Sequence, residues 1–380
     1  MDVDERARAQ IERVRALPDV ARVALMADHH KGYGVPIGGV MASPTHIAPG
    51  GVGYDIACGN KAVRTSLTVD EIHGDLPRLM DEIFATLSFG VGRRNNERVD
   101  HPVLDDPRWR SHPVPDARRL AAAQLGTIGG GNHYVDLLRG EDGQLWVACH
   151  FGSRGIGHKT ATWFLRRLGA RDDMDAPPVL LDTRTPLGQD YLDLMHLAGE
   201  YAYAGRDWVI DRVLRILGAR AVDSVHVHHN FAWRERHDGV DLWVVRKGAT
   251  PLLPGARGFI GGSMGDISVI VRGRDGQPAS LLASAPHGAG RVMSRTQAAG
   301  KRRRRGGPPR AGVIDWQAVR ADLRARGIEL RGAAADEAPG CYKPLEAVLA
   351  AHADALEIEE RLEPVGVAMA GPDIADPYRD

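Results

Sequence analysis

Residues 23–59 read VALMADHHKGYGVPIGGVMASPTHIAPGGVGYDIACG, and this stretch decides the class of fold. Its first four residues are apolar and predict a buried strand that runs into the Asp-His-His sequence at residues 28–30. The segment from residue 32 to residue 59 is dense in glycine and contains two prolines, which predicts short strands and tight turns rather than helix. The chain therefore opens with β structure that leads directly into polar side chains.

Outside this stretch, helical and strand-like segments are interspersed. Apolar residues recur at helical spacing in residues 3–17, 159–169, 189–218, 315–326 and 344–361. Strand-like apolar runs occur at residues 145–148, 224–228, 242–245 and 268–271. The polar, proline-containing residues 92–119 predict an exposed excursion. The basic run from Lys301 to Arg305, with the glycines and prolines after it, predicts a solvated loop.

Motif-rich segments are spread from residue 28 to residue 343, with no clear linker and no internal repeat between them. A single site that gathers residues from the whole chain requires the chain to fold as one unit. We therefore expect one domain, residues 1–380, of the mixed α+β class, with sheets flanked by helices.

Composition sets limits on the class of protein. Apolar residues make up 43% of the chain, enough for a large core. Lys plus Arg equals Asp plus Glu at 49 each, so a nucleic-acid surface has to arise from local segregation of charge. Three cysteines make no disulfide framework and fit a reducing cytoplasm. The first residues lack a signal-peptide pattern, and no apolar run is long enough to span a bilayer, so we expect a cytoplasmic protein.

The first candidate metal site is the sequence Gly-Tyr-Asp-Ile-Ala-Cys-Gly, which contains Asp55 and Cys58. A carboxylate and a thiol three residues apart on a turn can bind one metal ion or bridge two. Thiolate and imidazole suit Zn²⁺ and other first-row ions, and a carboxylate adds tolerance for Mn²⁺. The alternative is an inert buried cysteine beside an aspartate that caps the turn.

Two further segments place histidine beside groups suited to phosphate. Three glycines precede Asn132 and His133, and glycine lets backbone N–H groups approach phosphate oxygens closely. His150 follows an apolar run and is expected at a strand end, and the planar fork of the nearby Arg154 suits phosphate. Taken singly, the glycine run followed by histidine can also be an ordinary turn.

Histidines also cluster in two later segments. On a strand, His226 and His228 share one face and His229, followed by Asn230, points to the other, so either face can chelate a metal. An exposed polar strand edge is the alternative. His287 lies in Pro-His-Gly-Ala-Gly-Arg, where small neighbours leave it open, as a nucleophile that attacks phosphorus must be. A structural turn histidine is the alternative there.

Together, these ligands with Arg154 and Arg291 indicate metal-assisted phosphoryl or nucleotidyl transfer. No Walker A pattern is present, and the lysine motif of DNA ligases and capping enzymes is not evident. If a covalent nucleotide forms, histidine is a better candidate than lysine to carry it.

In their order along the chain, these segments resemble the signatures of the RtcB RNA-splicing ligases. The resemblance rests on residues 28–38, 55–58, 130–133, 150–155, 229–230, 262–265, 287–291 and 336–343. It spans about residues 25–371, nearly the whole chain, and several such motifs in order are far more specific than any one of them.

The resemblance implies the family's α+β fold, with layered sheets and helices around a metal cleft, and a set of site residues. Two Mn²⁺ ions would be held, with a bridging thiolate, by Asp55, Cys58, His133, His150 and His229. The GTP phosphates and the RNA end would be held by Asn132, Asn230 and Arg154, with Arg291 also positioning phosphates. His287 would be the guanylylated histidine, and Ser263 and Tyr342 would lie around the guanine.

Three positions depart from the family pattern. Asp136 stands where the family usually has Glu, Ala370 where it has a Lys that touches guanine, and Gly262 where Pro is common. These changes leave the metal ligands and the nucleophile intact but put recognition of the base, in which Asp136 would take part, in question. They suggest a divergent branch linked to repair of damaged RNA rather than tRNA splicing.

The expected activity is GTP- and Mn²⁺-dependent joining of RNA 3′-phosphate or 2′,3′-cyclic phosphate ends to 5′-hydroxyl ends, on cleaved tRNA or damaged RNA, with an archease-like activator as a further partner. One alternative is a repair paralogue with altered nucleotide preference. Another is a metal-dependent phosphoesterase or nucleotidyltransferase without end joining. A third is an RNA-end-binding protein without chemistry, against which the intact ligands and His287 argue.

Overall fold

The computed structural model describes residues 4–171, 173–301 and 310–372, so most of the predicted basic loop, from residue 302 onward, lies outside the described residues. The helices are α1 (Glu5–Arg15), α2 (Pro49–Val52), α3 (Val69–Ile72), α4 (Leu76–Thr86), α5 (Ala117–Gln124), α6 (Arg154–Arg167), α7 (Pro186–Leu217), α8 (Arg295–Ala299), α9 (Trp316–Ala325) and α10 (Leu345–Ala350). The strands are β1 (Arg22–His30), β2 (Ile37–Ser43), β3 (His46–Ile47), β4 (Gly59–Thr68), β5 (Ser88–Phe89), β6 (Thr127–Gly129), β7 (Tyr134–Gly140), β8 (Gln144–Phe151), β9 (Leu181–Asp182), β10 (Ala221–His228), β11 (Asn230–His237), β12 (Val240–Lys247), β13 (Ala249–Pro251), β14 (Arg257–Ile260), β15 (Ser268–Gly273), β16 (Ser284–Pro286), β17 (Gly300–Lys301), β18 (Arg310–Ala311), β19 (Glu329–Arg331) and β20 (Leu356–Met369).

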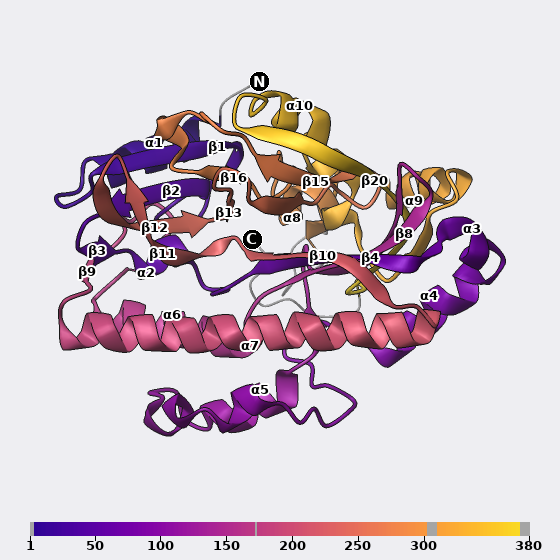
Figure 1. Cartoon of the computed structure of the whole chain (residues 1–380), viewed down its shortest axis with the longest axis horizontal. Coiled ribbons are helices and arrows are strands. Elements are labelled where there is room, and N and C mark those ends of the chain that lie inside the picture. The colour runs from indigo at the N-terminus through magenta and orange to yellow at the C-terminus, as the bar shows by residue number, and fades with distance from the viewer. Residues whose placement is uncertain (1–3, 172, 302–309, 373–380) are drawn as a thin grey trace.

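Two antiparallel sheets form the framework. In the described residues, the larger sheet has the order β10-β4-β8-β7-β20-β15-β14, with β19 added in parallel to β20, and the smaller has the order β1-β2-β12-β11. Helices flank these sheets, and the long α7 runs past both of them (Figure 1). The predicted mixed α+β class is confirmed.

The helix α7 joins the two halves of the core. Thr185 caps its first turn by accepting from the N–H of Gly188, Pro186 occupies the first helical position, and Gly218 ends the helix at a φ of 66°. Between these ends, apolar side chains from several faces are buried. The first half packs with α6 and the second half packs under β4 and β8, so α7 supports the strands that carry the candidate site.

The predicted helix at residues 344–361 is only partly correct. Helix α10 ends at Ala350, and the chain then enters β20, which lies between β7 and β15. The glutamates in this segment favour helix on propensity alone. They are accommodated in the sheet by cross-strand partners, since Glu359 forms ion pairs with Arg257 and Arg272. Sheet pairing on both sides therefore outweighs local preference.

The predicted exposed excursion at residues 92–119 is also wrong in part. Its few apolar residues are buried in the core against α7, among them Val103, Trp109 and Val114. The indole N–H of Trp109 donates to the carbonyl of Val103 at 2.7 Å, which satisfies the buried polar group. Sparse apolar residues spaced by short 3₁₀ turns carry no helical or strand period, so the pattern did not reveal their burial.

The other predicted elements are present with shifted bounds. The strand that begins at residue 23 is β1, and the glycine-dense segment forms β2, β3 and one short helical turn, α2, which the prediction of no helix excluded. The predicted helix at 159–169 begins five residues earlier, at Arg154. Within the described residues, no helix combines the length and apolar character needed to cross a membrane.

Candidate functional site

Four segments bring the candidate ligands together because their strands are neighbours. Cys58 precedes β4, His133 precedes β7, His150 lies near the end of β8, and His229 links β10 to β11. In the sheet register, His150 faces Asn60 on one side and Tyr134 on the other. The N–H of His229 donates to the carbonyl of Cys58 at 2.8 Å, which ties the first and the last of these segments together.

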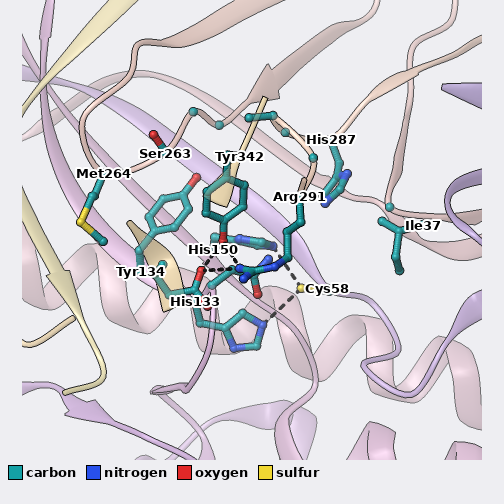
Figure 2. Close-up of a pocket in the computed structure, with 18 of the residues that line it drawn as sticks. Ile37, Cys58, His133, Tyr134, His150, Ser263, Met264, His287, Arg291 and Tyr342 are labelled. Carbon is teal, nitrogen blue, oxygen red and sulfur yellow. Dashed lines mark hydrogen bonds and ion pairs between the residues drawn. The ribbon is translucent and has the colours of Figure 1, made fainter. Parts of the chain in front are cut away.

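The ligand atoms of these residues converge. Sγ of Cys58 lies 3.5 Å from Nε2 of His133 and 3.2 Å from Nε2 of His150. Nε2 of His150 lies 2.9 Å from Nε2 of His229, and Nε2 of His133 lies 3.2 Å from Oδ2 of Asp55. Figure 2 shows Cys58 between the two imidazoles. The trio Cys58, His133 and His150 is compact enough to hold a metal ion.

A hydrogen bond on the far side of the His133 ring leaves its converging nitrogen available to a metal ion. Nδ1 of His133 lies 3.1 Å from the carbonyl of Ile128, which can only accept, so Nδ1 carries the proton and Nε2 a lone pair. Oδ2 of Asp55 accepts no hydrogen bond from any described residue. In the neutral ring, Nε2 of His133 and Oδ2 of Asp55 are two acceptors that face each other at 3.2 Å, a contact that requires a proton or a metal ion between them. The donor set therefore fits a metal ion.

The pKa shifts of these residues also bear on metal binding. Burial lowers the pKa of His150 and of His229 well below the ordinary value, so both rings are neutral ligands at pH 7. Burial and the neighbouring Asp55 raise the pKa of the Cys58 thiol. Burial opposes ionisation of Asp55, yet the nearby imidazole of His133 and the guanidinium of Arg154 leave its pKa lowered.

His287 lies beside this cluster and is oriented by a residue that the sequence patterns did not single out. Nδ1 of His287 lies 2.6 Å from Oδ2 of the fully buried Asp28, and the N–H groups of His287 and Gly288 also donate to that oxygen. The ring lies 4.6 Å, between centroids, from the ring of His229. Asp28 follows a predicted strand directly, and that position was the signal available in the sequence.

Two glycines allow the backbone to pack closely around His287 and Asp28. A Cβ at Gly248, whose φ is 61°, would lie 3.1 Å from Cε1 of His287. A Cβ at Gly290, whose φ is 76°, would lie 2.0 Å from the carbonyl oxygen of Asp28. Only glycine fits either position, so the loop after His287 packs directly against the end of β1.

A cavity of about 250 Å³ unites most of the predicted site residues. Its lining includes Asp55, Cys58, Asn132, His133, Asp136, His150, His229, Asn230, Ser263, His287, Arg291 and Tyr342. In the view of Figure 2, His287 and Ser263 lie on opposite sides of the cavity, with Tyr342 and Arg291 between them. Arg291 donates to the Tyr342 hydroxyl at 3.0 Å and pairs with Glu337 at 3.3 Å.

Asp136 and Ala370, the two departures from the family pattern that concern recognition of the base, lie in different environments. Asp136 lies opposite Val367 of β20 and lines the cavity. Its Oδ1 accepts no hydrogen bond from any described residue, and burial raises its pKa well above the ordinary value. Val367 and Met369 line the cavity, whereas Ala370 packs against a separate apolar cluster. Gly262, where the family commonly has proline, also lines the cavity.

Arg154 is the predicted residue that the cavity does not include. It begins α6 and lines a neighbouring groove of about 800 Å³ that shares Asp55, Asn132, His133 and Arg295 with the cavity. Nη1 of Arg154 lies 3.4 Å from Nδ1 of His133. Further cationic side chains in the groove come from Arg94, Arg119 and Lys159. Arg154 therefore stands between the ligand cluster and a basic groove.

The face of β10 that carries His226 and His228 points away from the cavity. Both rings instead contact Arg206 of α7. Of the two faces that the sequence left open, the structure brings only His229 to the cluster.

Comparison with known proteins agrees with this arrangement. The family model described as tRNA-splicing ligase RtcB matches residues 10–370. The chain is 32% identical to the tRNA-splicing ligase RtcB of Thermococcus kodakarensis, over 96% of this chain and 91% of that protein. It is 32% identical to the RNA-splicing ligase RtcB of Escherichia coli strain K12, over 94% and 92% of the two chains. With the RNA-splicing ligase RtcB of Mycobacterium tuberculosis it shares 31% identity, over 94% and 99%. The chain therefore belongs to the RtcB family of RNA-splicing ligases, which are enzymes.

Proposed function

We propose that this enzyme is a GTP- and Mn²⁺-dependent RNA ligase that joins 3′-phosphate or 2′,3′-cyclic phosphate ends to 5′-hydroxyl ends through a guanylylated His287. One observation carries the proposal. A histidine oriented by a buried carboxylate lies in the same cavity as a thiol, a carboxylate and three imidazoles whose ligand atoms converge. A nucleophile beside a metal-binding cluster fits transfer of a nucleotide.

The ligand atoms form a chain of contacts: Asp55 meets His133, Cys58 meets both His133 and His150, and His150 meets His229. These five residues would hold the two proposed ions, with the Cys58 thiolate at the centre of the chain. Bound ions would neutralise the triphosphate and act as Lewis acids at phosphorus.

The chain's own groups prepare His287 for attack. Asp28 accepts a hydrogen bond from Nδ1–H of His287, so the lone pair of the ring is on Nε2. The neutral Nε2 would form a bond to the α-phosphorus of GTP while the bond to pyrophosphate breaks. The same carboxylate stabilises the positive charge that develops on the ring. The product is a phosphoramidate between His287 and GMP.

In the second stage, the RNA 3′-phosphate takes GMP from His287, and a 5′-hydroxyl displaces GMP to make the new phosphodiester. A 2′,3′-cyclic end must first be opened by water to give that 3′-phosphate. Asn132 lines both the cavity and the groove, and with Asn230 in the cavity and Arg154 in the groove it would contact the phosphates. The groove, with Arg94, Arg119 and Lys159, is the surface that we assign to RNA.

Other features of the proposal rest on the family alone. RNA ends from cleaved tRNA or damaged RNA are the proposed substrates, and an archease-like protein is a proposed activator. Ser263 and Tyr342, with Asp136, are proposed to surround the guanine; all three line the cavity, and Ser263 lies opposite His287 in Figure 2. We also propose that residues 1–380 act as a single catalytic domain.

Two assays on the full chain test the function. With α-labelled GTP and Mn²⁺, the proposal requires a label that survives denaturing electrophoresis. With an RNA that bears a 3′-phosphate and a second that bears a 5′-hydroxyl, it requires a joined product. A label without joining would indicate a nucleotidyltransferase, and hydrolysis of phosphate esters without a label would indicate a phosphoesterase.

A further inference from the structure

Arg206 of α7 is fully buried, and its guanidinium reaches three segments of the chain. It donates to the carbonyl of Phe151 at 2.6 Å and to the carbonyl of Ala57 at 3.0 Å. Its Nε donates to Nε2 of His226 at 2.9 Å, and its Nη2 lies 2.9 Å from Nδ1 of His228. One planar side chain therefore contacts a turn, the end of β8 and the end of β10.

Each of these three segments carries one of the converging ligands. Ala57 precedes Cys58, Phe151 follows His150, and His228 precedes His229. The contacts lie within one residue of each ligand, on the side away from the cavity. A displacement of Arg206 would therefore be transmitted to three ligand positions at once.

The turn at Ala57 shows why such support is needed. Ala57 has a φ of 60°, a left-handed conformation that a residue with a Cβ adopts at an energetic cost. Its N–H donates to the carbonyl of Asn230 at 2.7 Å, and its carbonyl accepts from Arg206. These two hydrogen bonds fix the peptide groups on both sides of Ala57. Without the second, the turn can relax and move Sγ of Cys58.

The charge of Arg206 is also unusual in its surroundings. Arg246, which is equally buried, pairs with Glu235 at 2.6 Å. Arg206 forms no ion pair with a carboxylate among the described residues, and its donors go to carbonyls and imidazoles. Burying an unpaired cation is costly, so a role in stability alone explains it poorly. A fork of several N–H donors in one plane is what only arginine supplies.

We infer that Arg206 is a positioning residue of the metal centre, which holds Cys58, His150 and His229 in the geometry that an ion requires. This inference rests on the proposed metal centre. It assigns His226 and His228 to the support of Arg206 rather than to metal binding. Arg206 lines neither the cavity nor the groove, so it acts through the ligands alone.

The test is Co²⁺ binding by the full chain, followed by the near-ultraviolet absorption of the cobalt–thiolate bond. The variant Arg206→Met keeps much of the side-chain volume and removes the fork. We expect roughly 10- to 100-fold weaker Co²⁺ binding and a weaker thiolate band, as for other groups that orient metal ligands. Arg206→Lys keeps the charge but cannot span three segments, and should bind more weakly than the parent as well.

The matched control is Arg246→Met, which removes an equally buried guanidinium. Thermal unfolding should show lost stability in this variant, while its folded form binds Co²⁺ like the parent. Unchanged affinity and an unchanged band in folded Arg206→Met would overturn the inference. If that variant does not fold, parental binding by Arg206→Lys would overturn it instead. A parent protein that binds no Co²⁺ would refute the metal centre itself, which is a separate failure.

Discussion

At the scale of single residues, neighbouring acceptors determine which nitrogen of each reactive imidazole carries a proton. The Ile128 carbonyl fixes the proton of His133, and the Asp28 carboxylate fixes that of His287. Each assignment leaves Nε2 as the lone-pair nitrogen. Burial keeps the pKa of His150 and His229 low, so those two rings are neutral at pH 7. The proposed chemistry depends on these proton positions, and three predictions follow at this scale.

Ion affinity should rise with pH. A bound ion must displace the thiol proton of Cys58, whose pKa burial raises, whereas His150 and His229 have no proton to lose at pH 7. One displaced proton corresponds to roughly tenfold tighter binding per pH unit below the thiol pKa. Calorimetric titration at several pH values measures this slope.

Cys58→Ala should remain folded, bind the ion more weakly, show a flatter dependence of affinity on pH and form no nucleotide adduct. Full adduct formation by that variant with Mn²⁺ would refute the shared-thiolate site.

Asp28→Asn should slow formation of the His287 adduct by roughly a thousandfold or more, because an amide can present its N–H₂ to Nδ1 and favour the wrong tautomer. Ion binding and thermal stability measured on the same preparation serve as controls, since Asp28 contacts no ligand of the cluster. A variant that forms the adduct at the parental rate would show that the 2.6 Å contact plays no part in the reaction.

Nucleotide discrimination should be imperfect. A carboxylate can accept from N1–H and N2–H₂ of guanine, which adenine does not offer, but Asp136 is one methylene shorter than the family's glutamate. Burial raises its pKa, which further weakens it as an acceptor. We expect GTP to be preferred and ATP to be used measurably, with Asp136→Glu sharpening the preference. The assay is competition of labelled GTP with about a thousandfold excess of unlabelled ATP. An undiminished GTP adduct would show that discrimination is intact.

At the scale of elements, the sequence predicted those strands whose apolar runs end in polar residues. Asp28, His150 and His229 all follow such runs. His150 and His229 line the cavity, and Asp28 contacts His287, which also lines it. The sequence-based predictions fail where tertiary contacts determine the local structure. The glutamate-rich β20 is a strand because it pairs on both sides, and residues 92–119 are packed because a few apolar side chains reach α7. The partnership of Arg206 with three segments joins residues up to 149 positions apart, and no local pattern records it.

The groove at the start of α6 gives the prediction that belongs to this scale. Arg119→Glu and Lys159→Glu should weaken binding of a single-stranded RNA with a 5′-hydroxyl end, because both cations line the groove beside the ligand cluster. Each lost phosphate contact should also reduce the slope of log affinity against log salt by about 0.7. Fluorescence anisotropy over a salt series measures both. Arg320→Glu, at an exposed position on α9 that lines neither the cavity nor the groove, is the matched control. If Arg119→Glu and Lys159→Glu bind RNA as tightly as the control Arg320→Glu does, RNA does not bind in this groove.

At the scale of the whole molecule, residues from His30 to Met369 line one cavity because the two sheets and α7 bring distant strand ends together (Figure 1). Membership of the RtcB family accounts for the order of these segments. The overall charge is balanced, yet several cationic side chains gather in the groove. The single-domain organisation stays a prediction that limited proteolysis of the full chain would address.

The most direct measurement is identification of the residue that carries GMP. The full chain is incubated with GTP and Mn²⁺, digested at alkaline pH to preserve a phosphoramidate, and sequenced by tandem mass spectrometry. We expect GMP on His287, an adduct that acid removes and base leaves intact, and no adduct in His287→Ala although that variant still binds Mn²⁺. GMP on a lysine or on His228, or an undiminished adduct in His287→Ala, would contradict the assignment of His287 as the nucleophile.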